Sequence, residues 1–380
     1  MDNRTCFCRY SKCALYGNTV PLARLKFRDW HYGAARFRCQ LCAHLVSART
    51  GTAYAGVRTE LSLYLRGAKA LAEGLSLRAT GRLLDVDKDT VNHWLPLLGR
   101  HCQGVMNYFF RKLHLSECQL DELWTFIYKK ERQLTPLEKL AEVYGDAWVW
   151  IAFSPVCKLV PVWVVGKRTL PHARRLVFRL KSATDGQIPF FTSDELPHYA
   201  AALLEVYGEW VHPPRHGTRG RFPKPRRVPP PDLCYAVVVK EREQGRVVEV
   251  TTRIVYGTTE QVEAALRASP VSHTINTYGV ERNNLTIRQH SRRMGRKVNA
   301  FSKDLDYLEH QLTLAFAYYH FVIPHRGLRQ RLSHPLLTKG RKGSYKKWKP
   351  VTPAMAAGLT DHVWTMDELL SFRVPPKHLW

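Results

Sequence analysis

Four cysteines in two close pairs constrain the beginning of this chain more strongly than any other feature of its sequence. Cys8 and Cys13 form the first pair, and Cys39 and Cys42 form the second. Two such pairs on two tight turns can bring four thiolates to the corners of a tetrahedron, the geometry that structural zinc prefers. So small a segment cannot be held together by its apolar residues alone. The spacing therefore predicts a zinc ribbon over residues 1–55.

The identity of the first zinc ligand is open between two cysteines, because Cys6 lies close to Cys8 in the sequence. We favour Cys8, since the residues after Cys13 (ALYG) allow the chain to turn back. Most of the nine cysteines precede residue 43, which indicates metal binding in a reducing cytoplasm rather than a disulfide scaffold. The other cysteines lie in apolar settings and are predicted to be core residues: Cys102, Cys118, Cys157 and Cys234.

The charge balance of the chain indicates a polyanionic partner. Lys and Arg number 58 against 32 acids, which gives a formal net charge of +26. The positive charge is clustered at residues 215–227, 282–303 and 326–349, so nucleic acid is the expected partner. The N-terminus lacks the apolar core of a signal peptide, and no apolar run is long enough for a membrane span, so we expect a cytoplasmic chain. Its 380 residues are too many for one ordinary core and predict several domains.

The segment LSLRATGRLLDVDKDTVNHWLPLLG (75–99) predicts two short helices around a tight turn. Ser76 can cap the first helix, and Asp87 can cap the second. Val86 is a lone apolar residue in the turn between them.

The second of these helices carries one apolar stripe. Its residues recur at helical spacing and are predicted to be buried: Val91, Trp94, Leu95 and Leu98. Thr90, Asn92 and His93 then point outward near the N-terminal end of the helix, where a helix-turn-helix presents its base-reading residues. Residues 56–113 are therefore predicted to form a helix-turn-helix DNA-binding domain, with a plain packing hairpin as the alternative.

From Leu115 onward, strand-like runs alternate with helices. Residues 114–130 predict a strand that contains Asp121, and residues 144–169 predict two further strands that turn near Ser154. An amphipathic helix follows, and then a short apolar strand that ends at Asp194. Three antiparallel strands, a helix and another strand are the opening order of a ribonuclease-H-like fold. The ends of the first and fourth strands of such a sheet lie side by side, so Asp121 and Asp194 are expected to face one another.

Two carboxylates within a cationic surface repel each other unless a divalent cation lies between them. Mg²⁺ prefers oxygen ligands and keeps open positions for phosphate and water. Glu281, on a later helix that is expected to pack against this edge, completes three carboxylates for two metal ions. Taken singly, each acid is more often a turn cap, a helix cap or part of an intrahelical ion pair; the three together favour a metal site for phosphodiester chemistry.

Basic and amide residues follow Glu281 closely. Arg288 lies two helical turns after Glu281 on the same face, where it can hold a phosphate beside the metal ions, and Asn284 shares that face. Further cations extend the predicted DNA-binding surface, although surface solvation explains each of them taken alone: Arg292, Arg293, Arg296 and Lys297.

These motifs together resemble a known family. The run VERNNLTIRQHSRRMGRKVNAFSK (280–303) is similar to the C-terminal signature of the insertion-sequence-one family of prokaryotic DDE transposases. DELW (121–124) and TSDELPHY (192–199) resemble its two aspartate motifs, and the cysteine ribbon followed by the helix-turn-helix resembles its N-terminal DNA-binding part. The resemblance covers roughly residues 8–330.

The resemblance implies that Asp121, Asp194 and Glu281 are the catalytic triad and that Arg288 is the accompanying basic residue. It also implies a nucleoid-associated prokaryotic protein that recognises the terminal inverted repeats of its own element on double-stranded DNA, as a homo-oligomer. The three acids would bind Mg²⁺ or Mn²⁺, and the four cysteines would bind a structural Zn²⁺.

The predicted fold class is multidomain α+β/α/β. A ribonuclease-H-like mixed-sheet catalytic domain is expected over residues 114–325, after the zinc ribbon (1–55) and the helix-turn-helix domain (56–113), and a basic C-terminal segment over 326–380. An insertion is expected at about 211–257, with a loop rich in proline and arginine and a β-hairpin. A DNA clamp, a dimer contact and a strand-addition edge remain open as its role.

The sequence thus predicts a DNA transposase that binds the ends of its element, releases a 3′-hydroxyl by Mg²⁺-dependent cleavage and joins it to target DNA. A non-catalytic zinc and helix-turn-helix regulator is one alternative, and a ribonuclease-H-like nuclease or resolvase, which cuts without joining, is the other.

Overall fold

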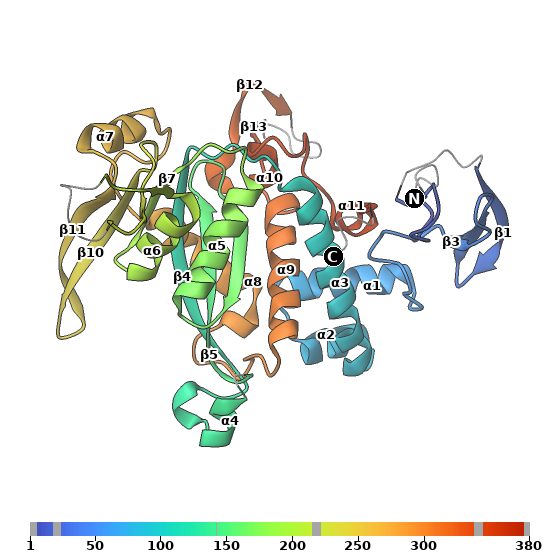
Figure 1. Cartoon of the computed structure of the whole chain (residues 1–380). Helices are drawn as coiled ribbons and strands as arrows, with labels where there is room; N and C mark the ends of the chain where they lie inside the picture. Colours follow the sequence, from blue (N-terminus) through green and yellow to red (C-terminus); the bar gives the residue numbers. More distant parts are fainter. Residues whose placement is uncertain (1–5, 18–23, 142, 215–221, 338–344, 376–380) are drawn as a thin grey trace. The chain divides into compact units, whose positions relative to one another are not determined.

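The computed structural model describes residues 6–17, 24–141, 143–214, 222–337 and 345–375. The chain forms two compact units (Figure 1). The central unit is one continuous segment, Arg111–Thr286, whereas the terminal unit combines Met1–Phe110 with Ile287–Trp380. The first unit boundary lies close to the predicted end of the helix-turn-helix domain. Residues 287–325 were expected in the catalytic domain, and they group instead with the N-terminal part of the chain.

The central unit is built on a six-stranded mixed sheet. Its strands are β4 (Glu117–Ile127), β5 (Gly145–Ser154), β6 (Leu159–Gly166), β7 (Phe190–Asp194), β10 (Tyr235–Glu243) and β11 (Arg246–Tyr256), in the spatial order β11-β10-β7-β4-β5-β6. β4, β5 and β6 are antiparallel neighbours, and β7 runs parallel to both β4 and β10. The predicted strands around Asp121 and Asp194 are confirmed, and so is the adjacency of the first and fourth strands.

Helices cover this sheet and connect its strands. The remaining elements of the central unit are η3 (Glu131–Gln133), α4 (Pro136–Leu140), α5 (Leu170–Ala183), α6 (Pro197–Tyr207), β8 (Glu209–Val211), β9 (Arg226–Val228) and α7 (Thr259–Ala268). α8 (Tyr278–His290) starts in the central unit and ends in the terminal unit. The amphipathic helix α5 buries Leu176, Val177 and Leu180 and packs on β5, β6 and α6. Under α7, Val262 packs against Phe190 of β7 and Ala236 of β10.

The predicted insertion at 211–257 needs a correction, because its hairpin belongs to the sheet itself. β10 pairs in parallel with β7, with Tyr235 opposite Phe191 and Val238 opposite Asp194, and β11 pairs with β10. The apolar start of β10 is buried and fills the sheet beside β7, so this strand is a structural part of the central unit. Residues 215–221 of the predicted loop rich in proline and arginine lie outside the described residues.

The terminal unit contains a small antiparallel sheet, a set of helices and a separate two-stranded ribbon. The sheet comprises β1 (Leu25–His31), β2 (Ala34–Cys39) and β3 (Leu45–Ser47), and the ribbon β12 (Gln330–Leu337) and β13 (Tyr345–Lys349). The helices are α1 (Leu61–Ala72), α2 (Leu77–Leu84), α3 (Lys88–Phe109), η4 (Arg292–Met294), α9 (Leu305–Phe321), η5 (Arg326–Leu328), α10 (Pro353–Ala356) and α11 (Met366–Ser371).

The predicted helix pair is confirmed in its caps and in its buried stripe. The Ser76 side chain accepts a hydrogen bond from the Ala79 N–H (3.2 Å), and the Asp87 side chain accepts one from the Asp89 N–H (2.7 Å). All residues of the apolar stripe are buried. The second helix is not short, however: α3 has 22 residues, because α9 packs along it and supplies a partner for a much longer apolar face. The two helices meet closely at Gly99, where an added Cβ would lie 2.6 Å from His310.

The described residues of the predicted basic C-terminal segment are part of the folded terminal unit. The Tyr54 hydroxyl donates to Asp367 Oδ1 (2.6 Å), and the Arg373 guanidinium donates to the carbonyls of Thr50 (2.8 Å) and Ala48 (2.6 Å). Trp364 is buried against Phe109 of α3 and Phe321 of α9. These contacts join the two ends of the chain into one core.

Among the helices of the described segments, none combines the length and the apolar character that crossing a bilayer requires.

Candidate functional site

The register between β4 and β7 brings two predicted acids together. The strands are parallel and Leu120 lies opposite Ser193, so Asp121 and Asp194 follow as neighbours at the same end of the sheet. One oxygen from each of Asp121, Glu122 and Asp194 lies within 4.8 Å of the other two. A pocket of about 530 Å³ opens at this edge. It is lined by Asp121, Arg168, Asp194, Glu195, Leu196, Pro197, Val238, Lys240, Arg242, Thr277 and Glu281.

Asp121 is held on both of its carboxylate oxygens. The Glu122 N–H donates to Oδ1 (2.8 Å), and the Asn284 side-chain amide donates to Oδ2 (2.5 Å). Burial raises the pKa of Asp121 to about 7, and the neighbouring carboxylates of Glu122 and Asp194 act in the same direction. A proton or a cation therefore stabilises this carboxyl group at neutral pH.

Asp194 lies at the end of β7, where the Leu196 N–H donates to its Oδ1 (3.3 Å). Burial raises the pKa of Asp194 above its usual value, while the positive charges of Arg168 and Lys240 oppose that shift. Two partly buried acids side by side repel each other, and a divalent cation between them removes that repulsion.

Glu122 is a member of the acidic group that sequence reasoning missed. Its Oε1 accepts from Arg168 (2.6 and 2.9 Å), and its Oε2 accepts from the Tyr199 hydroxyl (2.8 Å). The alternation of side chains along a strand predicts that Glu122 and Asp121 point to opposite faces, so the sequence pattern alone argued against it. Its partners come from residues distant along the chain, and no sequence signal in this region identifies them.

Glu281 lines the same pocket but stands apart from the close acidic group. Its Oε1 accepts from Lys240 Nζ (2.5 Å) and from the Thr277 hydroxyl (2.9 Å). Among the described residues, the close group of potential metal ligands at the sheet edge consists of Asp121, Glu122 and Asp194. The structure thus brings Asp121 and Asp194 together and holds Glu281 at the pocket wall through Lys240, a residue that the sequence analysis did not single out.

The start of α8 is fixed to β4 by Gln119. The Gln119 side chain donates to the Asn276 carbonyl (3.1 Å) and accepts from the Val280 N–H (2.8 Å). Gly279 allows this close approach, since an added Cβ would lie 2.7 Å from the Gln119 side-chain oxygen. Gln119 lies two residues before Asp121, so the same strand positions both Asp121 and the helix that carries Glu281.

The chemistry of the donor set fits Mg²⁺ or Mn²⁺. The potential ligands are carboxylate oxygens, and Asn284 adds an amide beside Asp121. Asn284 Oδ1 is buried and has no hydrogen-bond partner among the described residues. A bound cation or its water ligands would satisfy such an orphaned oxygen. Asn284, which was predicted to contact DNA, thus lies beside the acidic cluster and donates to Asp121.

Most of the cations predicted to follow Glu281 lie beyond α8. The helix ends at His290, so the following cations do not extend it. Arg288 is grouped with the terminal unit and donates to the Met294 carbonyl (3.3 Å), and Arg293 donates to the Ser302 hydroxyl (2.9 Å). Neither is among the residues that line the acidic pocket. Of the four cations predicted to extend the DNA-binding surface beyond the helix, three are exposed: Arg292, Arg296 and Lys297.

The predicted base-reading residues differ in their accessibility. His93 is exposed near the start of α3, and Thr90 is half-buried. Asn92 donates to the Tyr307 hydroxyl of α9 (3.0 Å), because α9 packs against this side of α3. The prediction that all three point outward is therefore wrong for Asn92.

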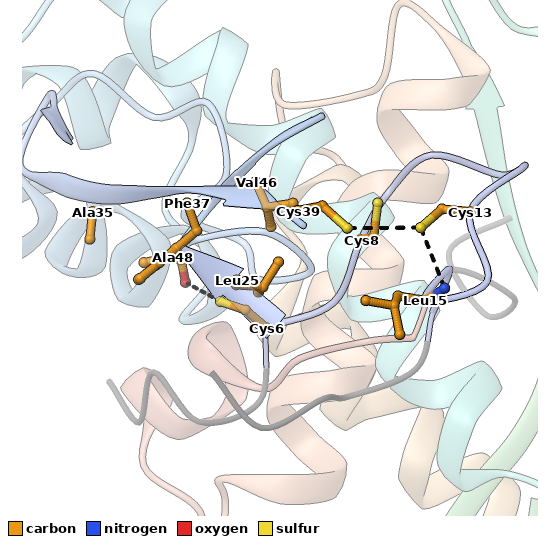
Figure 2. Packing of buried hydrophobic residues seen from close by; sticks show 10 residues of the cluster. All are labelled: Cys6, Cys8, Cys13, Leu15, Leu25, Ala35, Phe37, Cys39, Val46 and Ala48. Atoms are coloured by element: carbon orange, nitrogen blue, oxygen red, sulfur yellow. Dashed lines mark hydrogen bonds between the residues drawn. The ribbon is translucent and has the colours of Figure 1, made fainter. Parts of the chain in front are cut away.

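The four predicted cysteines come together beside the small N-terminal sheet. Figure 2 shows three of them, Cys8, Cys13 and Cys39. The Sγ atoms of Cys8 and Cys42 are 3.4 Å apart, those of Cys13 and Cys39 are 3.9 Å apart, and all four lie within 4.8 Å of one another. The Cys6 thiol instead points to the carbonyls of Ser47 and Ala48, at 3.9 and 4.0 Å. The four thiols therefore form a possible zinc site with Cys8, and not Cys6, as the first ligand.

A scan of protein-family models gives no match to this chain, and a search of curated proteins gives none either.

Proposed function

We propose that this chain is a DNA transposase with a ribonuclease-H-like catalytic domain, in which Asp121, Asp194 and Glu281 hold Mg²⁺ or Mn²⁺. The observation that carries the proposal is the shared pocket of these three acids, which are far apart in the sequence. The antiparallel strands β4–β6 with β7 and β10 added in parallel support the ribonuclease-H-like fold. The similarity of the motifs around the three acids to the insertion-sequence-one family supports the reaction class.

The walls of the pocket support a phosphodiester as the substrate. Arg168, Lys240 and Arg242 line it together with the acids, so cations and metal-binding carboxylates face the same space. A DNA backbone needs neutralising charge along the strand as well as at the reacting phosphate.

A bound divalent ion would supply a Lewis acid and an activated oxygen nucleophile for phosphodiester displacement. The chain's own residues perform the other tasks. Asp121 and Asp194 would hold the ion, and Asn284 orients the Asp121 carboxylate through its amide. Glu281 would add a third ligand if its ion pair with Lys240 opened, and Lys240 could then contact a phosphate oxygen. Glu122 positions Arg168 and Tyr199 at the side of the pocket.

The remaining parts of the proposal concern DNA recognition. The zinc ribbon and the α2–α3 pair would bind the inverted-repeat ends of the element, with His93 as the most accessible of the predicted base-reading residues. Exposed cations would add a sequence-independent contribution that weakens as the salt concentration rises. The proposal also includes that the chain acts on DNA as a homo-oligomer, in a prokaryotic cytoplasm.

The test is joining of a labelled duplex that carries the inverted repeats flanking the gene to a target plasmid, with Mg²⁺. We expect joined product with the wild-type chain and about a thousandfold less with Asp194→Asn, since one metal ligand is lost. Glu263→Gln, which changes an exposed acid of α7 in the same manner, is the matched control and should retain joining. Cleavage without joining would favour a nuclease or resolvase. End binding without any cleavage would favour a regulator.

A further inference from the structure

The two strands β12 and β13 form a ribbon of their own in the terminal unit. Arg331 lies opposite Trp348 and Leu336 opposite Lys346, with an irregular register between these pairs. The ribbon is a two-stranded sheet and is drawn as a separate pair of strands in Figure 1. Leu332 is half-buried, and all other described residues of both strands are exposed. An isolated ribbon with both faces in water contributes little to a folded core, so its surface needs another explanation.

The ribbon is uniformly cationic. No Asp or Glu occurs in the sequence between Glu309 and Asp361. The described cations of the ribbon and its flank are Arg329, Arg331, Lys346, Lys347 and Lys349. No described carboxylate lies within ion-pair distance of Arg331, Lys346 or Lys347, so these charges are not neutralised within the described chain.

The residues that flank the ribbon are anchored to each other and to the core. The His325 N–H donates to the Val351 carbonyl (2.9 Å) just before β12 and just after β13, and Val351 is buried. The Arg329 guanidinium lies 4.1 Å from the centre of the Trp348 ring. This cation–π contact holds the Trp348 side chain of β13 against the residue that precedes β12. The strands are thus presented to solvent in a defined position on the terminal unit.

We propose that the β12–β13 ribbon lies in the major groove of duplex DNA and contacts phosphates on both sides of the groove. The major groove has room for a two-stranded β-ribbon, and unpaired cations on both strands match the two phosphate rows that border it. Lysine is depleted in protein–protein interfaces, which argues against a protein partner for this surface. Single-stranded nucleic acid is less favoured, because Arg329 already covers one face of Trp348, the ring that would stack on a base.

This inference rests on the proposed function only in taking DNA as the partner, and it adds a contact outside the zinc ribbon, the α2–α3 pair and the acidic pocket. It predicts that the ribbon supplies sequence-independent affinity. The slope of log K against log salt concentration is negative, and each phosphate contact that is lost should reduce its magnitude by about 0.9.

The test compares duplex binding by the full chain and by the triple variant Arg331→Ala/Lys346→Ala/Lys347→Ala, over a range of salt concentrations and without added divalent metal. The probe is a random-sequence duplex in a fluorescence-anisotropy titration. We expect the slope to fall by about 2 to 3 and the affinity near 0.1 M salt to fall at least about tenfold.

The matched control removes the same charge from the central unit: Arg132→Ala/Lys139→Ala/Arg267→Ala, all at exposed positions. A ribbon variant with the slope of this control would overturn the inference. A changed oligomeric mass with an unchanged slope would also overturn it and assign the ribbon to contacts between copies of the chain. If the triple variant does not fold, as judged by its thermal transition, Lys347→Ala alone should still lower the slope by about 0.9.

The joining assay separates the two proposals. Normal joining with an unaltered slope in the ribbon variant rejects the ribbon inference alone. A reduced slope together with no joining by the wild-type chain rejects the transposase proposal alone, since duplex binding is measured without chemistry.

Discussion

The cysteine cluster and the acidic pocket are both candidate metal sites, but they are assembled in different ways. The four thiols come from two close pairs along the chain, one before β1 and one at the end of β2 and in the turn after it, and all four converge. The acids come from strands and a helix that are distant in the sequence; Asp121 and Asp194 meet, while Glu281 is held back by Lys240. Local spacing therefore brings all the predicted residues together in the first case, whereas in the second case Glu281 would have to leave Lys240 to join the other two acids.

The largest effect is expected at the cysteine cluster. Cys39→Ser should abolish zinc binding and unfold the β1–β3 sheet, because zinc contributes on the order of 10 kcal/mol to folding such small modules. Zinc content and hydrogen exchange of residues 24–47 measure the outcome. Cys6→Ser is the matched control and should keep its zinc, since the Cys6 thiol faces carbonyls and not the other thiols. Equal zinc content in both variants would contradict the assignment.

A smaller effect of opposite sign is expected at Asp121. Its pKa is raised from 3.8 to about 7 in the folded chain, so the folded state binds this proton more tightly than the unfolded state. The free energy of unfolding of the Mg²⁺-free chain should therefore fall as pH rises through this window. Asp121→Asn should raise the free energy of unfolding by about 2 kcal/mol at pH 8 and change it little near pH 4.

Denaturant unfolding at the two pH values measures this difference. A variant that is equally stabilised at both, or destabilised at pH 8, would show that the Asp121 carboxylate is not under electrostatic strain. Added Mg²⁺ should stabilise the wild-type chain and have little effect on Asp121→Asn.

The ion pair between Lys240 and Glu281 gives a further way to test the contrast between the two sites. Lys240→Met should strengthen Mn²⁺ binding to the DNA-free chain about tenfold, or about 1.4 kcal/mol, because it frees Glu281 and removes a competing positive charge. Electron paramagnetic resonance of free Mn²⁺ gives the affinity. Lys240→Arg keeps the charge and should bind Mn²⁺ like the wild type; tighter binding in both variants would indicate that the ion pair is irrelevant.

The smallest effect is expected at the edge of the acidic group. Tyr199→Phe removes the hydroxyl that donates to the largely buried Glu122 carboxylate and should cost about 1 kcal/mol of stability. Thermal unfolding measures it. Tyr256→Phe, which removes a hydroxyl hydrogen bond to the Ala200 carbonyl at a more exposed position, is the comparison and should cost less.

What the sequence predicted follows the same division between local and distant determinants. The caps at Ser76 and Asp87, the buried stripe of α3, the strand that contains Asp121 and the strand that ends at Asp194 depend on residues close in the chain, and they are confirmed. The thiol cluster belongs to this class as well.

The errors concern partners that lie far away along the chain. β10 was assigned to an insertion because a hairpin pattern does not reveal parallel pairing with β7. Asn92 was predicted to face outward because nothing in its own helix indicates that α9 would cover it. Glu122 belongs to the acidic group although side-chain alternation along β4 predicts that it points away from Asp121. Lys240, on β10, binds Glu281, and no local pattern predicts that contact. Each depends on a tertiary contact that periodicity and spacing do not contain.

The most direct test of the central claim is Mn²⁺ binding to the wild-type chain, Asp194→Asn and Glu281→Gln, measured side by side by electron paramagnetic resonance. If these acids share one site, Asp194→Asn should weaken binding about a hundredfold, and Glu281→Gln should weaken it about tenfold, because Lys240 competes for Glu281. Unchanged affinity in both variants would contradict the account, since the pocket that unites these acids would then hold no divalent cation.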